Sequence, residues 1–444
     1  MALSLGSAAL AAPDARPRPA ATGNGAALPV VQTPAVRTPA PQTPPAPTNL
    51  LPVPMPPPVA PAWPLRDARA LLEVIRGIGS EGLLPRDYEP DVLAAAIKRG
   101  EGPALDETAT RLFTWLAEDL RDGRTPMGAR LQWFAVDPDM DLNPTAVILA
   151  RALERHDVAG ELGALAPLHP DYAALREALS AATLQDAALI RANMDRWRWL
   201  ARDMGKQYLI TNVPEYMLRL TVNNRIITSY RTVVGAPKTP TPQIAETVEG
   251  VIFNPTWTVP QSIVKGEGLG ARLLGNPRLA ARQGYKVTKA ADGFVKVVQQ
   301  PGPGNSLGLM KLDMPNPHAI FLHDTPHREL FGAETRAFSH GCVRVDRASE
   351  LAMMMAILGA GLTKEDGIAH TLSGTYTKVP MTRTFPIYIT YMTYARDVNG
   401  ELRKFADIYN RDAPVLAAFN APRQLHTTQR TSNEPVVEIV DPLT

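Results

Sequence analysis

The sequence predicts an α+β fold: a helical domain, then a mostly-β domain with a sandwich or barrel-like sheet and one capping insertion. Between residues 65 and 185 apolar side chains recur at three- and four-residue spacing, the period of an amphipathic helix. From Gln207 the period falls to two, as in strands. The 444 residues leave room for two or three domains with at least one large core.

Two N-terminal segments precede these domains. Residues 1–12, MALSLGSAALAA, are similar to the apolar core and cleavage region of a secretory signal, but no positive residue precedes them. Residues 13–64 are rich in proline, and the first 64 residues hold 17 of the 43 prolines. Proline fixes φ and removes a backbone donor, so we expect a disordered tether. Nothing in the sequence supports the alternative, a ligand for a proline-binding module.

The helical domain is expected over residues 65–185, and a linking helix over residues 186–206. Trp197 and Trp199 in the linking helix are two residues apart, so they leave different helix faces and can contact both neighbouring domains. The stretches with helical period are residues 68–78, 90–100, 108–123, 145–157 and 172–182.

The β domain is expected over residues 207–420. Its short β-rich stretches follow one another without helices between them, which favours antiparallel pairing. Asn223-Asn224 is typical of a two-residue hairpin turn, and residues 349–359 have a helical pattern. We expect residues 421–444 to form a loose tail.

Residues 261–291 interrupt the strand series with glycines, basic residues and a short helical stretch near 276–283. Long insertions of this kind often act as lids or binding loops. The basic residues either suit an acidic substrate or form an ordinary solvated face; they are Lys265, Arg272, Arg278, Arg282 and Lys286.

The composition argues against several classes of protein. The formal net charge is only +2, which does not suggest a nucleic-acid partner. A single cysteine excludes an internal disulfide and zinc sites built on several cysteines. No apolar run reaches about 18 residues, so we expect no membrane span. We expect no metal and no cofactor.

The most informative stretch surrounds the lone cysteine. His323 ends a predicted strand, and Cys342 follows 19 residues later. An imidazole can deprotonate a thiol at neutral pH, so the two residues are a candidate base and nucleophile. Asp324 is adjacent to the histidine and could orient it.

The residues before the cysteine, Ser339-His340-Gly341, suggest a tight turn. Gly341 tolerates such a turn and can direct the amides of Gly341 and Cys342 toward a developing oxyanion. Two other interpretations remain: a structural cysteine beside chance histidines, and a metal site of irregular spacing built from His323, His327, His340 and Cys342.

The spacing resembles the catalytic motif of the L,D-transpeptidase (YkuD-type) family, a histidine followed after about fifteen residues by Ser/Thr-His-Gly-Cys. Further stretches are similar to the large Gram-negative subgroup of this family that has a helical scaffold domain: GLLPRDY, MDRWRWLARDMGKQYLITNVPEY, FNPTWTVPQSI and RAFSHGCVRV. The resemblance covers roughly residues 65–420.

The resemblance implies a role for each candidate residue. Cys342 forms an acyl-enzyme, and His323 is its base. Asp324 is a weaker candidate, because the histidine partner in this family is often a backbone carbonyl. Ser339, His340 and Gly341 shape the pocket and the oxyanion hole. Arg344 either holds a substrate carboxylate or forms a structural ion pair, and Trp257 belongs with residues 261–291 to the cap over the acyl-donor groove.

The resemblance also implies a function: cross-linking of peptidoglycan stem peptides in the periplasm of a Gram-negative cell, with 3→3 or 1→3 linkages to diaminopimelate and with carbapenems as inhibitors. One departure is that larger relatives carry an inserted peptidoglycan-binding domain, whereas only residues 183–190 separate LREALSAA from RANMDRW here. The alternatives are an L,D-carboxypeptidase, a D-amino-acid exchanger or a lipoprotein-linking or -releasing enzyme of the same fold, and a non-catalytic wall-binding protein.

Overall fold

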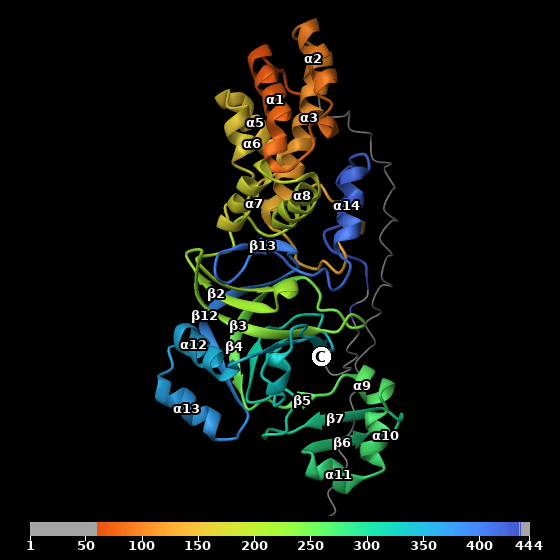
Figure 1. Cartoon of the computed structure of the whole chain (residues 1–444), viewed down its shortest axis with the longest axis vertical. Coiled ribbons are helices and arrows are strands. Elements are labelled where there is room, and N and C mark those ends of the chain that lie inside the picture. The colour runs from red at the N-terminus through yellow and green to blue at the C-terminus, as the bar shows by residue number, and fades with distance from the viewer. Residues whose placement is uncertain (1–59, 435, 437–444) are drawn as a thin grey trace, which may run out of the picture. The chain divides into compact units, whose positions relative to one another are not determined.

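In the computed structural model, residues 60–434 and Val436 are described (Figure 1). The predicted signal segment, nearly all of the predicted tether and the last part of the predicted tail lie outside these residues. No helix among the described residues is long and apolar enough to cross a membrane.

The first part of the described chain is a helical domain, as the sequence predicts. Apolar residues at three- and four-residue spacing, such as Leu112 and Leu116, are fully buried in its core. Two short helices, α4 and α6, were not expected, because neither spans enough residues to show a period. The helices are α1 (Leu65–Gly77), α2 (Pro90–Arg99), α3 (Pro103–Asp122), α4 (Asp139–Leu142), α5 (Thr145–Arg155), α6 (Val158–Gly163) and α7 (Pro170–Ser180).

The linking helix is α8 (Leu184–Arg198). Trp197 lies within this helix, and Trp199 directly follows its last residue. Trp197 stacks on His169 with ring centroids 4.2 Å apart, and Trp199 meets Trp133 edge-on at 5.4 Å. The ring partners of both tryptophans belong to the helical domain, so these two contacts do not show the predicted division between the two neighbouring domains. Both tryptophans are buried, so this helix is fixed on two sides.

The β domain is a closed, barrel-like sheet. The strand order is β10-β3-β11-β9-β8-β4-β12-β1-β2, and a further pairing of β3 with β2 closes it. The strands are β1 (Gln207–Asn212), β2 (Met217–Val222), β3 (Arg225–Gly235), β4 (Ile244–Phe253), β8 (Met310–Asp313), β9 (Leu322–His323), β10 (Ala337–Ser339), β11 (Val343–Val345) and β12 (Thr377–Thr390).

The pairing is mixed rather than antiparallel throughout. β1 pairs with β12, β9 with β11 and β3 with β10 in parallel. The hairpin between β2 and β3 is as predicted, because Asn223 and Asn224 both have positive φ, 49° and 58°. Helix α12 (Ala348–Ala360) buries Leu351 and Met355 in the core of the sheet.

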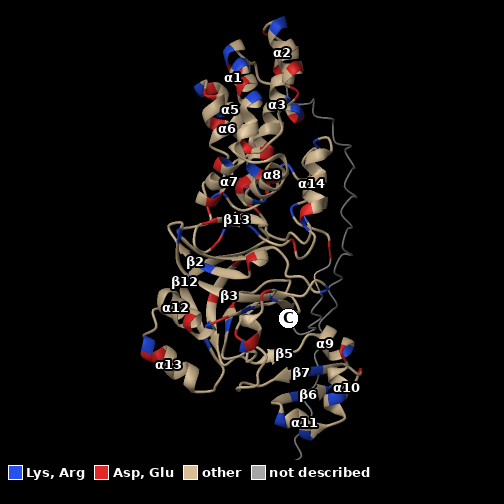
Figure 2. Cartoon of the chain, in the orientation of Figure 1, with Lys and Arg blue, Asp and Glu red and all other residues tan. Residues whose placement is uncertain are grey.

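The insertion folds as a separate unit, which we call the capping subdomain, residues 257–299. It contains β5 (Trp257–Thr258), α9 (Gln261–Gly266), α10 (Leu269–Leu274), α11 (Pro277–Arg282), β6 (Tyr285–Lys289) and β7 (Val295–Gln299). The three strands form their own sheet in the order β5-β7-β6, separate from the main sheet. Lys and Arg residues lie along α10, α11 and β6 (Figure 2).

The predicted loose tail differs most from the structure. Helix α14 (Asp412–Asn420) ends the predicted β domain, and the next residues, 421–434, are held by side-chain contacts along the helical domain. We call residues 421–434 the strap. Its contacts are ion pairs and hydrogen bonds rather than apolar burial, so no hydrophobic period marks it in the sequence.

Candidate active site

Two short parallel strands place the cysteine and the histidine together. Leu322 of β9 pairs with Val343 of β11, and His323 pairs with Arg344. Because side chains alternate along a strand, His323 and Arg344 face the same side, and so does Cys342, two residues before Arg344. All three line one cavity of about 340 Å³.

Most of the predicted site residues line this cavity. Ser339, His340 and Gly341 line it beside the cysteine, and Trp257 lines it from the capping subdomain. His327, which the metal alternative requires, is not among the lining residues; its Nδ1 lies 3.2 Å from Glu329 on the surface. Within residues 60–434 no three metal-binding side chains gather closely enough to hold a metal ion.

His323 is buried and held in one tautomer. Its Nδ1 donates a hydrogen bond to the carbonyl oxygen of Asp324 at 2.5 Å. A carbonyl only accepts, so Nδ1 carries the proton and Nε2 keeps a free lone pair. Burial, together with the charge of Arg344, lowers the pKa of His323 to about 3. The imidazole is therefore neutral in the resting site, with the lone pair of Nε2 free.

The carboxylate of Asp324 does not orient the histidine. Its oxygens accept from the N–H of Leu309 at 2.8 Å and pair with Arg328 at 2.6 Å, on the side away from the cavity. Only the backbone carbonyl of Asp324 contacts His323. The side-chain role considered for Asp324 is therefore wrong, because adjacent residues of an extended chain point in opposite directions.

The turn before the cysteine is held by hydroxyl groups. The Ser339 hydroxyl donates to the carbonyl of Cys342 at 2.5 Å and accepts from the N–H of Gly341 at 3.1 Å. Thr241 donates to the carbonyl of Gly341 at 2.8 Å. Gly341 has φ of +113°, which favours glycine, and an added Cβ would lie 3.2 Å from Ile320.

This arrangement changes the expected oxyanion hole. The N–H of Gly341 is already bonded to Ser339, so it does not point freely at the cavity. The N–H of Cys342 has no hydrogen-bond partner in the described part of the chain and is the free donor at this turn.

The cavity carries positive charge without matching carboxylates. Neither Arg344 nor Arg272 makes an ion pair with any residue in the described ranges, and Nε of Arg344 is buried without a hydrogen bond. The structural ion pair considered for Arg344 is thus not present among the described residues. The carboxylate that lines the cavity, Glu267, pairs with His340 at 2.8 Å.

Two domain families match this chain. Residues 206–381 match the L,D-transpeptidase catalytic domain family, and residues 59–179 match the scaffold domain family. These two domains are an L,D-transpeptidase catalytic domain and its scaffold domain.

One curated relative is a putative L,D-transpeptidase from Haemophilus influenzae, 29% identical over 228 residues. The match covers 48% of this chain and 46% of the relative, so the chain spans about half the length of the curated relative. An L,D-transpeptidase from Mycobacterium smegmatis aligns over 42% of this chain and 58% of its own, with 13% identity and a TM-score of 0.21. One from Enterococcus faecium aligns over 43% and 52%, with 11% identity and a TM-score of 0.22.

Sequence reasoning missed one charged residue of the L,D-transpeptidase domain. Lys311 of β8 lies opposite His323, and its ammonium is 3.4 Å from the ring centroid of Phe321. Burial lowers the pKa of Lys311, and its charge lowers that of Cys342. In the sequence, Lys311 is marked only as a lysine between two apolar residues, Met310 and Leu312. Its position opposite His323 follows from the register of β8 against β9.

We expect the thiol of Cys342 to react faster as the pH rises. Burial raises its pKa, and the N–H of Phe321 and the charges of Lys311 and Arg344 offset this only in part. Below its pKa the thiolate fraction, and with it the alkylation rate, increases about tenfold per pH unit. Because His323 stays neutral down to about pH 3, no step should appear near pH 6.5. Iodoacetamide kinetics followed by intact mass would measure this, and a plateau below pH 7 would instead indicate a preformed thiolate–imidazolium pair.

Proposed function

We propose that this protein is a periplasmic acyltransferase that cross-links peptidoglycan stem peptides through an acyl-enzyme on Cys342. The observation that carries the proposal is the cavity lined by Cys342, neutral His323 and Arg344, whose guanidinium has no ion-pair partner among the described residues. A nucleophile, a base and a site for a carboxylate are what transfer of an acidic peptide requires.

In the first half-reaction, Nε2 of His323 takes the thiol proton, and the sulfur of Cys342 attacks the carbonyl carbon of the donor residue. The negative charge on the carbonyl oxygen is stabilised by the N–H of Cys342. The carbon–nitrogen bond to D-Ala then breaks, and His323 returns the proton to the departing amine. The product is a thioester on Cys342 and free D-Ala.

In the second half-reaction, the side-chain amine of diaminopimelate attacks the thioester. His323 accepts a proton from this amine, a carbon–nitrogen bond forms and the carbon–sulfur bond breaks. The proton passes to the sulfur and restores the thiol. Arg344 and Arg272 supply positive charge for the carboxylates of the two stems. With diaminopimelate as the donor residue and D-Ala as the leaving group, this scheme gives a 3→3 linkage. A 1→3 linkage requires the acyl-enzyme to form instead on the L-Ala at position 1, and the rest of the stem then leaves in place of D-Ala.

The test is incubation with purified tetrapeptide muropeptides, followed by mass spectrometry. We expect cross-linked dimers together with released D-Ala, and fragmentation of the dimers identifies the linkage. Tripeptides without dimers would show that water is the acceptor and that the protein is a carboxypeptidase. If neither product forms, the wall-binding alternative is favoured.

We also expect a carbapenem to acylate the protein once, at its one cysteine. The β-lactam carbonyl takes the place of the donor carbonyl, and opening of the strained ring supplies the leaving group. Intact mass should show a single adduct, and peptide mapping should place it on Cys342. The absence of any adduct at millimolar drug would contradict a donor-accepting cavity.

A further inference from the structure

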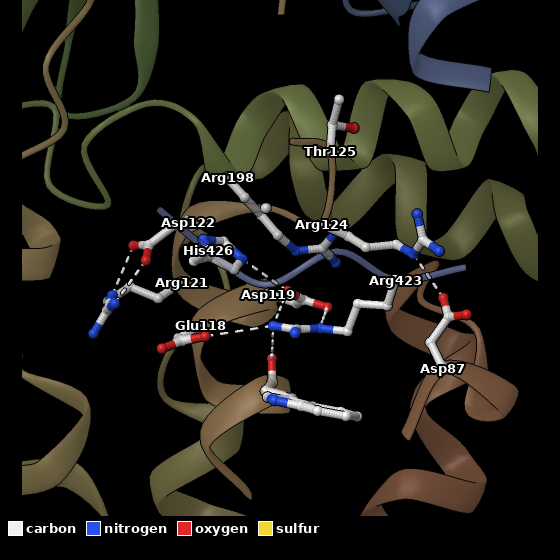
Figure 3. A network of polar contacts seen from close by, with 12 residues as sticks. Asp87, Glu118, Asp119, Arg121, Asp122, Arg124, Thr125, Arg198, Arg423 and His426 are labelled. Carbon is white, nitrogen blue, oxygen red and sulfur yellow. Dashed lines mark hydrogen bonds and ion pairs between the residues drawn. The ribbon is translucent and has the colours of Figure 1, made fainter. Parts of the chain in front are cut away.

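The strap is tied to the helical domain by a buried carboxylate, Asp119 of α3, which has no exposed surface. Arg423 donates to its two oxygens at 2.8 and 2.9 Å, and His426 contacts it at 2.8 Å (Figure 3). Tyr88 donates to the same carboxylate at 2.8 Å. The strap is therefore fixed to α3 at its beginning.

The second half of the strap contacts a segment of the helical domain that in turn contacts the catalytic domain. Arg430 pairs with Asp141 at 2.6 Å, and the N–H of Ser432 donates to the carbonyl of Trp133 at 2.7 Å. Glu434 accepts from the N–H of Gln132 at 2.8 Å. Residues 132–134 are in turn bonded to Gln243, next to β4.

Two residues beyond the strap, Val436 lines the same cavity as Cys342. Its apolar side chain is a wall of the cavity that comes from neither the catalytic sheet nor the capping subdomain. The other apolar lining residues include Ile320, beside β9, and Ile263 and Leu269 of the capping subdomain. The strap thus connects a fixed point on the scaffold helix α3 to the wall of the cavity.

We propose that Val436, carried two residues beyond the strap, is a specificity element that sets the width of the catalytic cavity on one side. The side chain of Val436 limits which peptide arm of a stem can lie beside Cys342. The scaffold domain contributes to this selection because it holds the strap in place. This inference rests on the proposed function for its substrate class, the stem peptide, but the geometry of the wall can be tested without catalysis.

The test compares two truncated chains that differ by two residues, one ending at Glu434 and the other at Val436. Both keep every strap contact described above, and only the second keeps the wall. The readout is the ratio of labelling rates of Cys342 by a bulky reagent, fluorescein maleimide, and a small one, iodoacetamide. Because Cys342 is the only cysteine, intact mass reports on this site alone.

We expect the chain ending at Val436 to keep the full-length ratio, and the chain ending at Glu434 to raise it several-fold, because a wider cavity admits the bulky reagent more easily while the small reagent is little affected. In the full-length chain, Val436→Trp should lower the ratio and Val436→Gly should raise it. Identical ratios in both truncations and both point variants would overturn the proposal, and the strap would then be a structural clamp only.

A second readout links the wall to the reaction. The full-length chain and the chain ending at Glu434 are each incubated with acceptor stems of different size, and the muropeptide dimers that form are counted for each acceptor. The truncated chain should form a larger share of its dimers with the larger acceptor. If the full-length chain forms no dimers while the labelling ratio still changes as expected, the proposed function fails and the wall stands. If dimers form but acceptor preference and labelling ratio do not change, the wall fails and the function stands.

Discussion

Replacement of Cys342 by alanine is expected to abolish cross-linking and carbapenem adducts, a loss of about 10⁴-fold or more, since no other residue can carry the acyl group. The stability should change by no more than about 1 kcal/mol, because the thiol makes only a weak contact of 3.7 Å with the carbonyl of Ala319. Muropeptide analysis and thermal unfolding of the same preparation measure both effects. Cys342→Ser should also be inactive, because a hydroxyl is a poor match to a base placed for a thiol.

A pair of histidine variants provides the control. His323→Ala removes the buried base and should be inactive. His327→Ala should keep its activity, because His327 is an exposed residue of the following loop and does not line the cavity. Activity lost in both variants would revive the metal alternative, which needs both histidines. Cross-linking retained by the alanine variant of Cys342 would contradict the acyl-enzyme.

The features predicted well from the sequence are those with a local signal. Helix α3 repeats apolar residues over several turns, so its period identifies both the helix and its buried face. The turn Ser339-His340-Gly341-Cys342 and its distance from His323 are equally local, and the two strands β9 and β11 bring them together. In these cases neighbours in the sequence carry the information.

The features that sequence reasoning missed depend on contacts between distant residues. The sheet of the capping subdomain pairs β5 with β7, about forty residues later, and Val297 completes a core begun by Val259 and Ile263. The position of Lys311 follows only from strand register. In the sequence, Asp119 cannot be told from an ordinary exposed charge of a helix. Its burial is explained by partners that are distant in sequence, above all Arg423, more than three hundred residues later.

Replacement of Arg423 by alanine is expected to lower the free energy of unfolding by about 3 kcal/mol, because it leaves a buried carboxylate without its main charge partner. Asp119 would keep only His426 and Tyr88. The matched control is Arg430→Ala on the same strap. Its pair with Asp141 is partly exposed, so the cost should stay below about 1 kcal/mol. Urea unfolding of the two variants and of the unchanged protein measures the difference.

The pH dependence of this loss tests its cause. Burial by itself raises the pKa of Asp119, but the hydrogen bond from His426 and the charge of Arg423 bring it below its ordinary value. The stability from this carboxylate is thus present at neutral pH and is lost as the pH falls through the lowered pKa. Without Arg423 the burial effect dominates and Asp119 takes up a proton at higher pH, so the difference between the variant and the unchanged protein should shrink on acidification. A cost equal to that of Arg430→Ala, or one independent of pH, would show that the strap is not anchored through this charge.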